Sequence, residues 1–120
     1  MISAIHHVQL AAPTGSEPEL RAFYGGVLGL AEVAKPLELA KRGGVWFRGS
    51  GVEVHLGIED DFRPARKAHP AFIVFSLDAL ITRLTDAGVD VTPDDLFPGY
   101  RRCYAQDPVG NRIEFLEPAP

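Results

Sequence analysis

Apolar and polar residues alternate from Ile5 to Ala11, which predicts a strand with one buried face. The same alternation puts His7 on the face opposite to His6. A helix is predicted next. Residues 16–19 have the form of a capping box, and apolar residues then recur at helical spacing until Gly29. Three strand candidates come next, and a Gly-Ser-Gly hairpin signal joins the last two: residues 30–36, 45–48 and 52–58.

The same order of patterns returns in the second half of the chain. A strand pattern is followed by a helical stripe that ends near Gly88, and three further strand patterns complete the series: residues 69–75, 89–92, 101–106 and 112–117. Pro and Gly within residues 107–111 predict a turn between the last two strands. The charged segment 59–68 has no apolar periodicity and separates the copies. The sequence therefore predicts an α+β fold with tandem βαβββ modules, about residues 1–60 and 67–120, in one domain covering residues 1–120.

Composition narrows the class of partner. The 120 residues have a net charge of −4, and acidic and basic side chains are interspersed, so we expect a small molecule rather than nucleic acid. No apolar run reaches the length of a membrane span, and residues 1–7 lack the charged start and apolar core of a secretion signal. We therefore expect a soluble, cytoplasmic protein that does not bind membranes.

Four potential metal ligands occupy equivalent places in the two modules. His7 and His69 belong to the first strand of each module, and His55 and Glu114 to the last, with separations of 48 and 45 residues. A single histidine on a strand is usually structural, but four donors at repeat-related positions favour a metal site. Imidazole and carboxylate ligands suit zinc, iron, nickel, cobalt or manganese better than calcium. His6 has no counterpart in the second module, so we interpret it as a packing or surface residue.

Three segments resemble the hallmarks of the vicinal oxygen chelate superfamily, which contains glyoxalase I, extradiol dioxygenases, fosfomycin-resistance thiol transferases and bleomycin-binding proteins. They are His7-Val8-Gln9-Leu10, Ala22-Phe23-Tyr24-Gly25-Gly26-Val27-Leu28-Gly29-Leu30 and Asp107-Pro108-Val109-Gly110-Asn111-Arg112-Ile113-Glu114-Phe115. The resemblance implies eight strands in a cupped mixed sheet, metal ligands at the four positions above, and a homodimer whose cups combine modules of both chains. At the position of His55, glyoxalase I usually has a glutamate, and the dioxygenase and fosfomycin branches usually have no ligand.

Three functions are compatible with this resemblance. The first is a metal-dependent isomerase or lyase of the glyoxalase type, which binds two adjacent substrate oxygens while Glu114 or His55 moves a proton. The second is an Fe(II) dioxygenase of the extradiol type, with His7, His69 and Glu114 as ligands and His55 as an acid–base group. The third is a metal-free protein that binds a small molecule, as bleomycin-resistance proteins do.

Substrate contacts are predicted from side chains on the strands beside the candidate ligands. Arg102 and Tyr104 alternate on the strand before Glu114, and Trp46 and Arg48 lie on the matching strand of the first module. Arginines in this position would favour an anionic substrate, although arginines on hairpins are as often only solvated charges.

Overall fold

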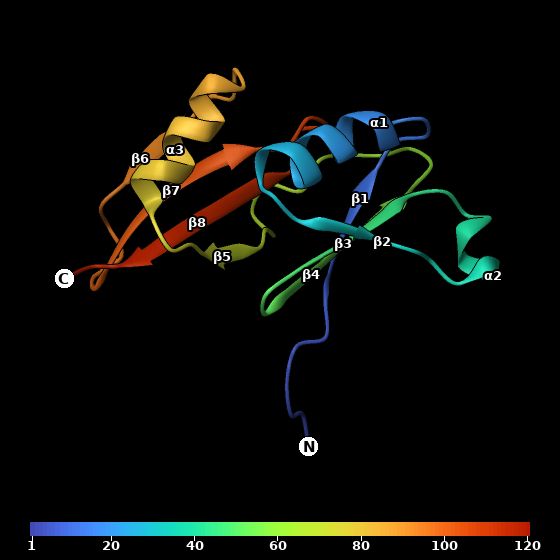
Figure 1. Ribbon diagram of the computed structural model, residues 1–120, viewed down its shortest axis with the longest axis horizontal. Coiled ribbons are helices and arrows are strands. Elements are labelled where there is room, and N and C mark those ends of the chain that lie inside the picture. The colour runs from blue at the N-terminus through green and yellow to red at the C-terminus, as the bar shows by residue number, and fades with distance from the viewer. The chain divides into compact units, whose positions relative to one another are not determined.

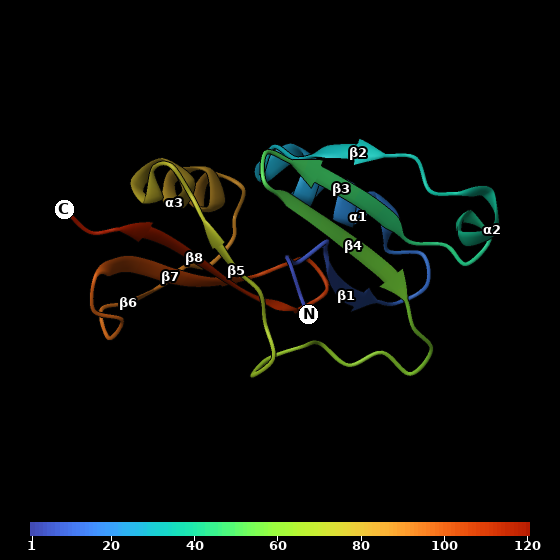
Figure 2. The same ribbon diagram turned by 90° about the horizontal axis from the view of Figure 1, so that it is seen from below.

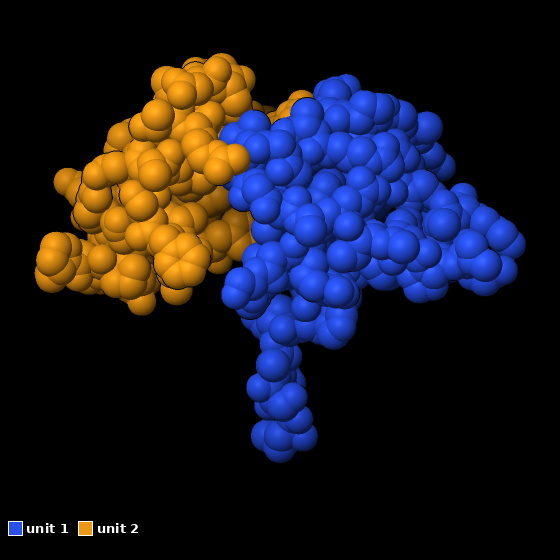
Figure 3. All heavy atoms as spheres, viewed as in Figure 1, with its two compact units in different colours: residues 1–64 blue, residues 65–120 orange.

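The computed structural model describes residues 1–120, whose elements form two series in the same order (Figure 1 and Figure 2). The first comprises β1 (Val8–Ala12), α1 (Glu17–Leu20), the π-helix η1 (Arg21–Val27), β2 (Ala31–Val33), α2 (Leu37–Ala40), β3 (Val45–Gly49) and β4 (Val52–Ile58). The second comprises β5 (Ala71–Ile73), α3 (Leu77–Asp86), β6 (Thr92–Asp94), β7 (Tyr100–Gln106) and β8 (Arg112–Pro118). The chain divides into unit 1, Met1–Pro64, and unit 2, Ala65–Pro120 (Figure 3). None of the helices combines the length and apolarity that crossing a membrane requires.

Each unit contains one four-stranded mixed sheet, and the two sheets have the same topology. The strand orders are β1-β4-β3-β2 and β5-β8-β7-β6. In both, the first strand pairs in parallel with the last, and the remaining pairs are antiparallel. The α+β fold of tandem βαβββ modules predicted from the sequence is confirmed.

The core of unit 1 lies between one face of its sheet and the helical segment α1–η1. Val54 and Leu56 alternate on β4 and are fully buried, as is Phe47 on the neighbouring strand. The helical segment contributes Leu20, Phe23 and Tyr24 to the same core. The segment changes from α- to π-helical spacing, and at its end the Leu28 amide donates to the Phe23 carbonyl, five residues back, at 2.9 Å.

The core of unit 2 lies under α3. Ser76 caps this helix, because its hydroxyl accepts a hydrogen bond from the Ala79 amide at 3.2 Å. Leu77 and Leu84 form its buried side, and the buried side chains of the sheet are Cys103, Ala105, Ile113, Phe115 and Leu116. Because alternate residues of β8 point to opposite faces, Ile113 and Phe115 face this core and Glu114 faces away.

Local details of unit 1 differ from the sequence prediction. The first strand begins at Val8 rather than at Ile5, so His6 and His7 precede it and strand alternation does not separate them. The capping box does not form, because the Ser16 hydroxyl donates to the Pro13 carbonyl at 2.6 Å. The short helix α2 lies where no element was predicted, just after a strand that is shorter than expected.

Candidate functional site

His69 and Glu114 come together in unit 2 because the chain before β5 runs along the start of β8. Three hydrogen bonds hold it there: Ala65 N to Asn111 Oδ1 at 2.9 Å, Arg112 N to Ala65 O at 2.8 Å, and Glu114 N to Pro70 O at 3.0 Å. Asn111 itself is fixed by Asp107, whose Oδ2 accepts from Asn111 Nδ2 at 3.0 Å.

The two side chains then meet at 2.9 Å, between His69 Nε2 and Glu114 Oε1. His69 Nδ1 lies 3.1 and 2.9 Å from the carbonyl oxygens of Arg66 and Lys67, which only accept hydrogen bonds. Nδ1 is therefore a hydrogen-bond donor, and Nε2 faces the carboxylate oxygen. Two lone pairs at this distance require a cation between them, either a proton or a metal ion. Two ligands at right angles around an ion, each about 2.1 Å away, are about 3 Å apart, so the pair fits a metal.

Arg102 holds the other side of the Glu114 carboxylate. Its Nη1 donates to Glu114 Oε2 at 3.1 Å, and its Nη2 donates to Asp94 Oδ2, also at 3.1 Å. The guanidinium lies 5.2 Å from the ring centre of Phe97 and 5.3 Å from that of Tyr104. Only 16% of the Arg102 side chain is exposed, so this ion pair is largely desolvated. The predicted substrate contact at Arg102 is thus already occupied by two carboxylates of the protein.

Three aromatic rings stack in unit 1. His55 on β4 lies between Trp46, its partner on β3, and His7, which precedes β1. The ring centres of His55 and Trp46 are 3.8 Å apart at an interplanar angle of 3°, and those of His55 and His7 are 4.0 Å apart at 17°. Imidazole lone pairs lie in the ring plane, and nearly parallel planes do not meet at a common point. In this arrangement His7 and His55 are not oriented to bind one ion together.

A carboxylate that was not among the predicted site residues, Glu53, orients His55. Glu53 Oε2 lies 2.8 Å from His55 Nε2, and Glu53 Oε1 accepts from Arg48 Nε, also at 2.8 Å. These hydrogen bonds, from His55 first and then Arg48, lower the pKa of Glu53 to about 2. An ionised carboxylate only accepts, so His55 Nε2 carries a proton, and Nδ1 is the nitrogen left to take up or release a second one. The strand alternation that puts Glu53 and His55 on one face was the signal for this pair.

His7 is suited to bind a metal as the neutral imidazole. Desolvation of its ring, together with the charges of His55 and His6, lowers the pKa of His7 below its ordinary value. Its Nδ1 lies 2.9 Å from His6 Nδ1, so the two neighbouring histidines contact each other instead of facing opposite ways.

The four predicted ligands therefore form two pairs, one within each unit. Unit 1 brings together His7 and His55, and unit 2 brings together His69 and Glu114. No group of three or more histidine, cysteine, aspartate or glutamate side chains is placed to hold a metal ion. The predicted substrate residues divide in the same way: Trp46 and Arg48 contact the first pair or its carboxylate, and Tyr104 and Arg102 contact the second.

A family model of the Glyoxalase/Bleomycin resistance protein/Dioxygenase superfamily matches residues 4–115. A glyoxalase family protein from Bacillus anthracis, known from a crystal structure, is 49% identical in sequence. The match covers 99% of this chain and 98% of the Bacillus anthracis chain, with a TM-score of 0.96. The fosfomycin resistance protein FosX from Listeria monocytogenes is 20% identical, with coverages of 99% and 96% and a TM-score of 0.78. TnmS3, an antibiotic binding protein from Streptomyces sp. CB03234, is 22% identical, with coverages of 99% and 100% and a TM-score of 0.72. No curated protein matches the sequence.

The match over nearly the whole chain shows that this protein belongs to the glyoxalase, bleomycin resistance protein and dioxygenase superfamily. The resemblance stated from its motifs is thereby confirmed. FosX and TnmS3, one a resistance protein and the other an antibiotic binding protein, share the fold with this chain at low identity. The fold alone therefore does not select a reaction.

Proposed function

We propose that the protein is a metal-dependent isomerase or lyase of the glyoxalase type, with His7, His69 and Glu114 as metal ligands and His55 as the catalytic base. The observation that carries the proposal is the His69–Glu114 pair, in which Nε2 and a carboxylate oxygen lie 2.9 Å apart with one cation between them, and Nδ1 is fixed as the donor. A divalent ion held there would polarise two adjacent oxygens of the substrate.

His55 is assigned to proton transfer because its geometry suits a base better than a shared ligand. Glu53 orients the ring through Nε2 and stabilises the imidazolium that forms when Nδ1 takes a proton, as the carboxylate of a histidine–aspartate pair does. In isomerase or lyase chemistry, Nδ1 would remove the proton from the carbon beside the substrate carbonyl and return it to a neighbouring atom. Stacking between His7 and Trp46 limits rotation of the His55 ring.

The ligand set combines donors from both units, and the superfamily resemblance predicts that a homodimer brings them together. A dimer would supply unit 1 of one copy to unit 2 of the other. The molecular mass in solution, measured with and without metal, tests for the dimer. Mixing His7→Ala chains with Glu114→Ala chains tests whether the two copies share a metal site. Recovery of metal binding in the mixture requires a site formed between copies.

Metal calorimetry on the purified protein and on His55→Ala tests the assignment. Wild type should bind one zinc, nickel, cobalt or manganese ion per site and release about one proton, because the ion displaces the proton between His69 and Glu114. His55→Ala should bind the ion within about threefold of wild type but lose turnover of hemithioacetals or related 2-oxo thioesters. Loss of metal binding in His55→Ala would make His55 a ligand, and absence of metal binding in wild type would reject the proposal.

An Fe(II) dioxygenase of the extradiol type is the second candidate. Two histidines and one carboxylate form the ligand set of such enzymes. The hydrogen bond between His55 and Glu53 would keep this ring from acting as a fourth ligand, which would leave a position for oxygen. Anaerobic loading with Fe(II), followed by catechol and oxygen, distinguishes the candidates. Ring cleavage without any turnover of thioesters would favour the dioxygenase.

A further inference from the structure

Unit 1 contains two cationic side chains, Lys35 and Arg42, that are neither proposed ligands nor predicted site residues. A pocket of about 470 Å³, here called the histidine-side pocket, is lined on one side by His7, His55 and Trp46. Lys35, Arg42 and Gln9 are among the residues that complete it, and no acidic residue lines it. The pocket is therefore cationic and continuous with the proposed base.

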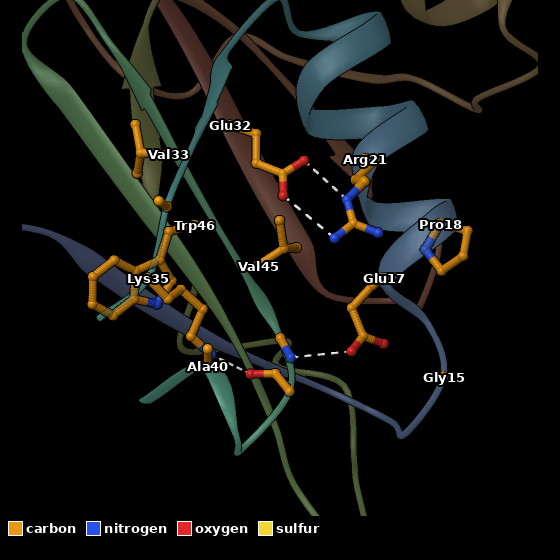
Figure 4. A pocket seen from close by; sticks show the side chains of 13 residues that line it. Gly15, Glu17, Pro18, Arg21, Glu32, Val33, Lys35, Ala40, Val45 and Trp46 are labelled. Carbon is orange, nitrogen blue, oxygen red and sulfur yellow. Dashed lines mark hydrogen bonds and ion pairs between the residues drawn. The ribbon is translucent and has the colours of Figure 1, made fainter. Parts of the chain in front are cut away.

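In a neighbouring pocket of unit 1, charged side chains are already bound by other groups of the protein. It has a volume of about 620 Å³ and is lined by Glu17, Arg21, Glu32 and Lys35 (Figure 4). Arg21 donates to both oxygens of Glu32, at 2.9 and 3.3 Å, and Glu17 Oε2 accepts from the Gly44 amide at 3.1 Å. Arg21, Glu32 and Glu17 therefore already have partners, so a charged ligand would have to displace them.

Of the two cations of the histidine-side pocket, Lys35 lines both pockets and Arg42 lines this one only. Arg42 is exposed and forms no ion pair in the chain. Lys35 donates from Nζ to the Gly43 carbonyl and lies 5.9 Å from the ring centre of Trp46. Burial lowers the pKa of the Lys35 ammonium below its ordinary value, so a bound anion would stabilise its charged form.

The backbone beside Arg42 is built to lie against the strand that carries His55. Gly43 and Gly44 have φ values of +74° and +86°, which favour glycine. A Cβ atom on Gly44 would lie 2.2 Å from the Leu56 carbonyl oxygen, so only glycine allows this approach to β4. Gly57 on β4 likewise leaves the space that the Gln9 amide occupies, since a Cβ there would lie 2.3 Å from Gln9 Nε2.

We propose that the histidine-side pocket binds the oxyanion group of the substrate, a carboxylate or phosphonate on a small organic molecule, through Arg42 and Lys35. Trp46 provides an apolar wall for the adjoining carbon atoms. This inference rests on the proposed function, in which His7 and His55 act on the other end of the same molecule. The residues that bind the charged group of the substrate are then Lys35 and Arg42, which flank α2. Arg48 and Arg102, the arginines predicted from the sequence, already bind carboxylates of the protein.

Trp46 is the only tryptophan in the chain and lines the pocket, so its fluorescence reports on binding. The test titrates metal-free protein, kept so with a chelator, at constant ionic strength and at pH 8, where free histidine side chains are neutral. The probes are propylphosphonate and butyrate, and the neutral comparison is dimethyl propylphosphonate. We expect a saturable change with at least one anion and a much weaker response to the ester.

Matched variants locate the charge that is responsible. Arg42→Gln should weaken anion binding about tenfold, and Arg42→Lys should restore part of it. Arg63→Gln is the control, because Arg63 is also an exposed arginine of unit 1 but does not line the pocket. A response in wild type that is not saturable, equal affinity for the ester, or an unchanged affinity in Arg42→Gln would overturn the inference.

Failure of this inference and failure of the proposed function give different results. Calorimetry with zinc on the same samples reports on the ligands, and the anion titration in chelator reports on the pocket alone. Metal binding without anion binding overturns the pocket assignment only. Anion binding without metal binding overturns the metal-dependent function and supports the pocket.

Discussion

Each unit contains a cluster of one imidazole, one carboxylate and one arginine, but these groups come from different positions along the chain. In unit 2 the last strand carries the carboxylate, Glu114, and the imidazole comes from His69 before the first strand. In unit 1 the last strand carries the imidazole, His55, and the carboxylate of Glu53 lies two residues earlier. The nitrogen–oxygen distances are 2.9 and 2.8 Å.

An arginine completes each cluster, but its environment differs between the units. Arg102 binds Glu114 with 16% of its side chain exposed, whereas Arg48 binds Glu53 with 60% exposed. The arginine of the unit 2 cluster is therefore largely desolvated, which suits the support of a metal ligand that must keep its orientation. The cluster of unit 1 is open at the arginine, which suits a group that changes its protonation state. Four experiments compare the two units.

The largest expected effect is on metal affinity. Glu114→Gln should weaken binding of zinc more than about 100-fold, because an amide replaces an anionic ligand. Glu53→Gln should leave zinc affinity within about threefold of wild type, because this carboxylate acts only through His55. Calorimetry on both variants makes the comparison. Equal losses would mean that the two carboxylates have the same role.

The two arginines should differ in their contribution to folding stability. Arg102→Met leaves Asp94 and Glu114 as neighbouring carboxylates without their shared cation, and should lower the free energy of unfolding by about 3 kcal/mol. Arg48→Met removes an exposed ion pair and should cost less than about 1 kcal/mol. Urea unfolding of the metal-free proteins measures both. A similar cost for the two variants would show that burial does not separate the clusters.

Acid sensitivity should reveal the Glu53–His55 hydrogen bond. The pKa of Glu53 is lowered from 4.5 to about 2 in the folded protein, so its stabilising contribution is complete above pH 4.5 and disappears as the pH falls toward 2. Between pH 5 and pH 2 the wild type should lose more stability than Glu53→Gln. Urea midpoints at several pH values provide the measurement. Parallel curves would contradict the hydrogen bond between Glu53 and His55.

The smallest effect is expected in a comparison of two natural probes, one in each unit. Cys103 is the only cysteine, lies fully buried in unit 2, and has a thiol whose pKa is raised by burial. It should react with a thiol reagent only after unit 2 opens, whereas Trp46 fluorescence reports on unit 1. If residues 1–120 form one domain, as the sequence predicts, urea curves from the two probes should coincide. Separate midpoints would show that the units unfold independently.

Much of the fold was predictable because local rules determine it. The pattern of residues 52–58 predicted a strand, and the alternation of β4 puts Val54 and Leu56 in the core and His55 on the opposite face. The α1–η1 helical segment ended near the predicted glycine, although the change to π-helical spacing carries no signal in the apolar stripe. The element α2 was missed because four residues are too few for a periodic pattern.

By itself the sequence determined the superfamily, the repeated topology and the four candidate ligands, because strand period, turn residues and spacing act over short distances. The tertiary structure alone decided which groups neutralise each other. Arg102 and Arg48 were expected to face a substrate, yet both bind carboxylates of their own unit. Arg42 was not selected from the sequence, yet it lines the pocket beside His55, because the Gly43–Gly44 turn brings the α2 region against β4. Such pairings depend on contacts between elements distant in the chain, which spacing along the sequence does not specify.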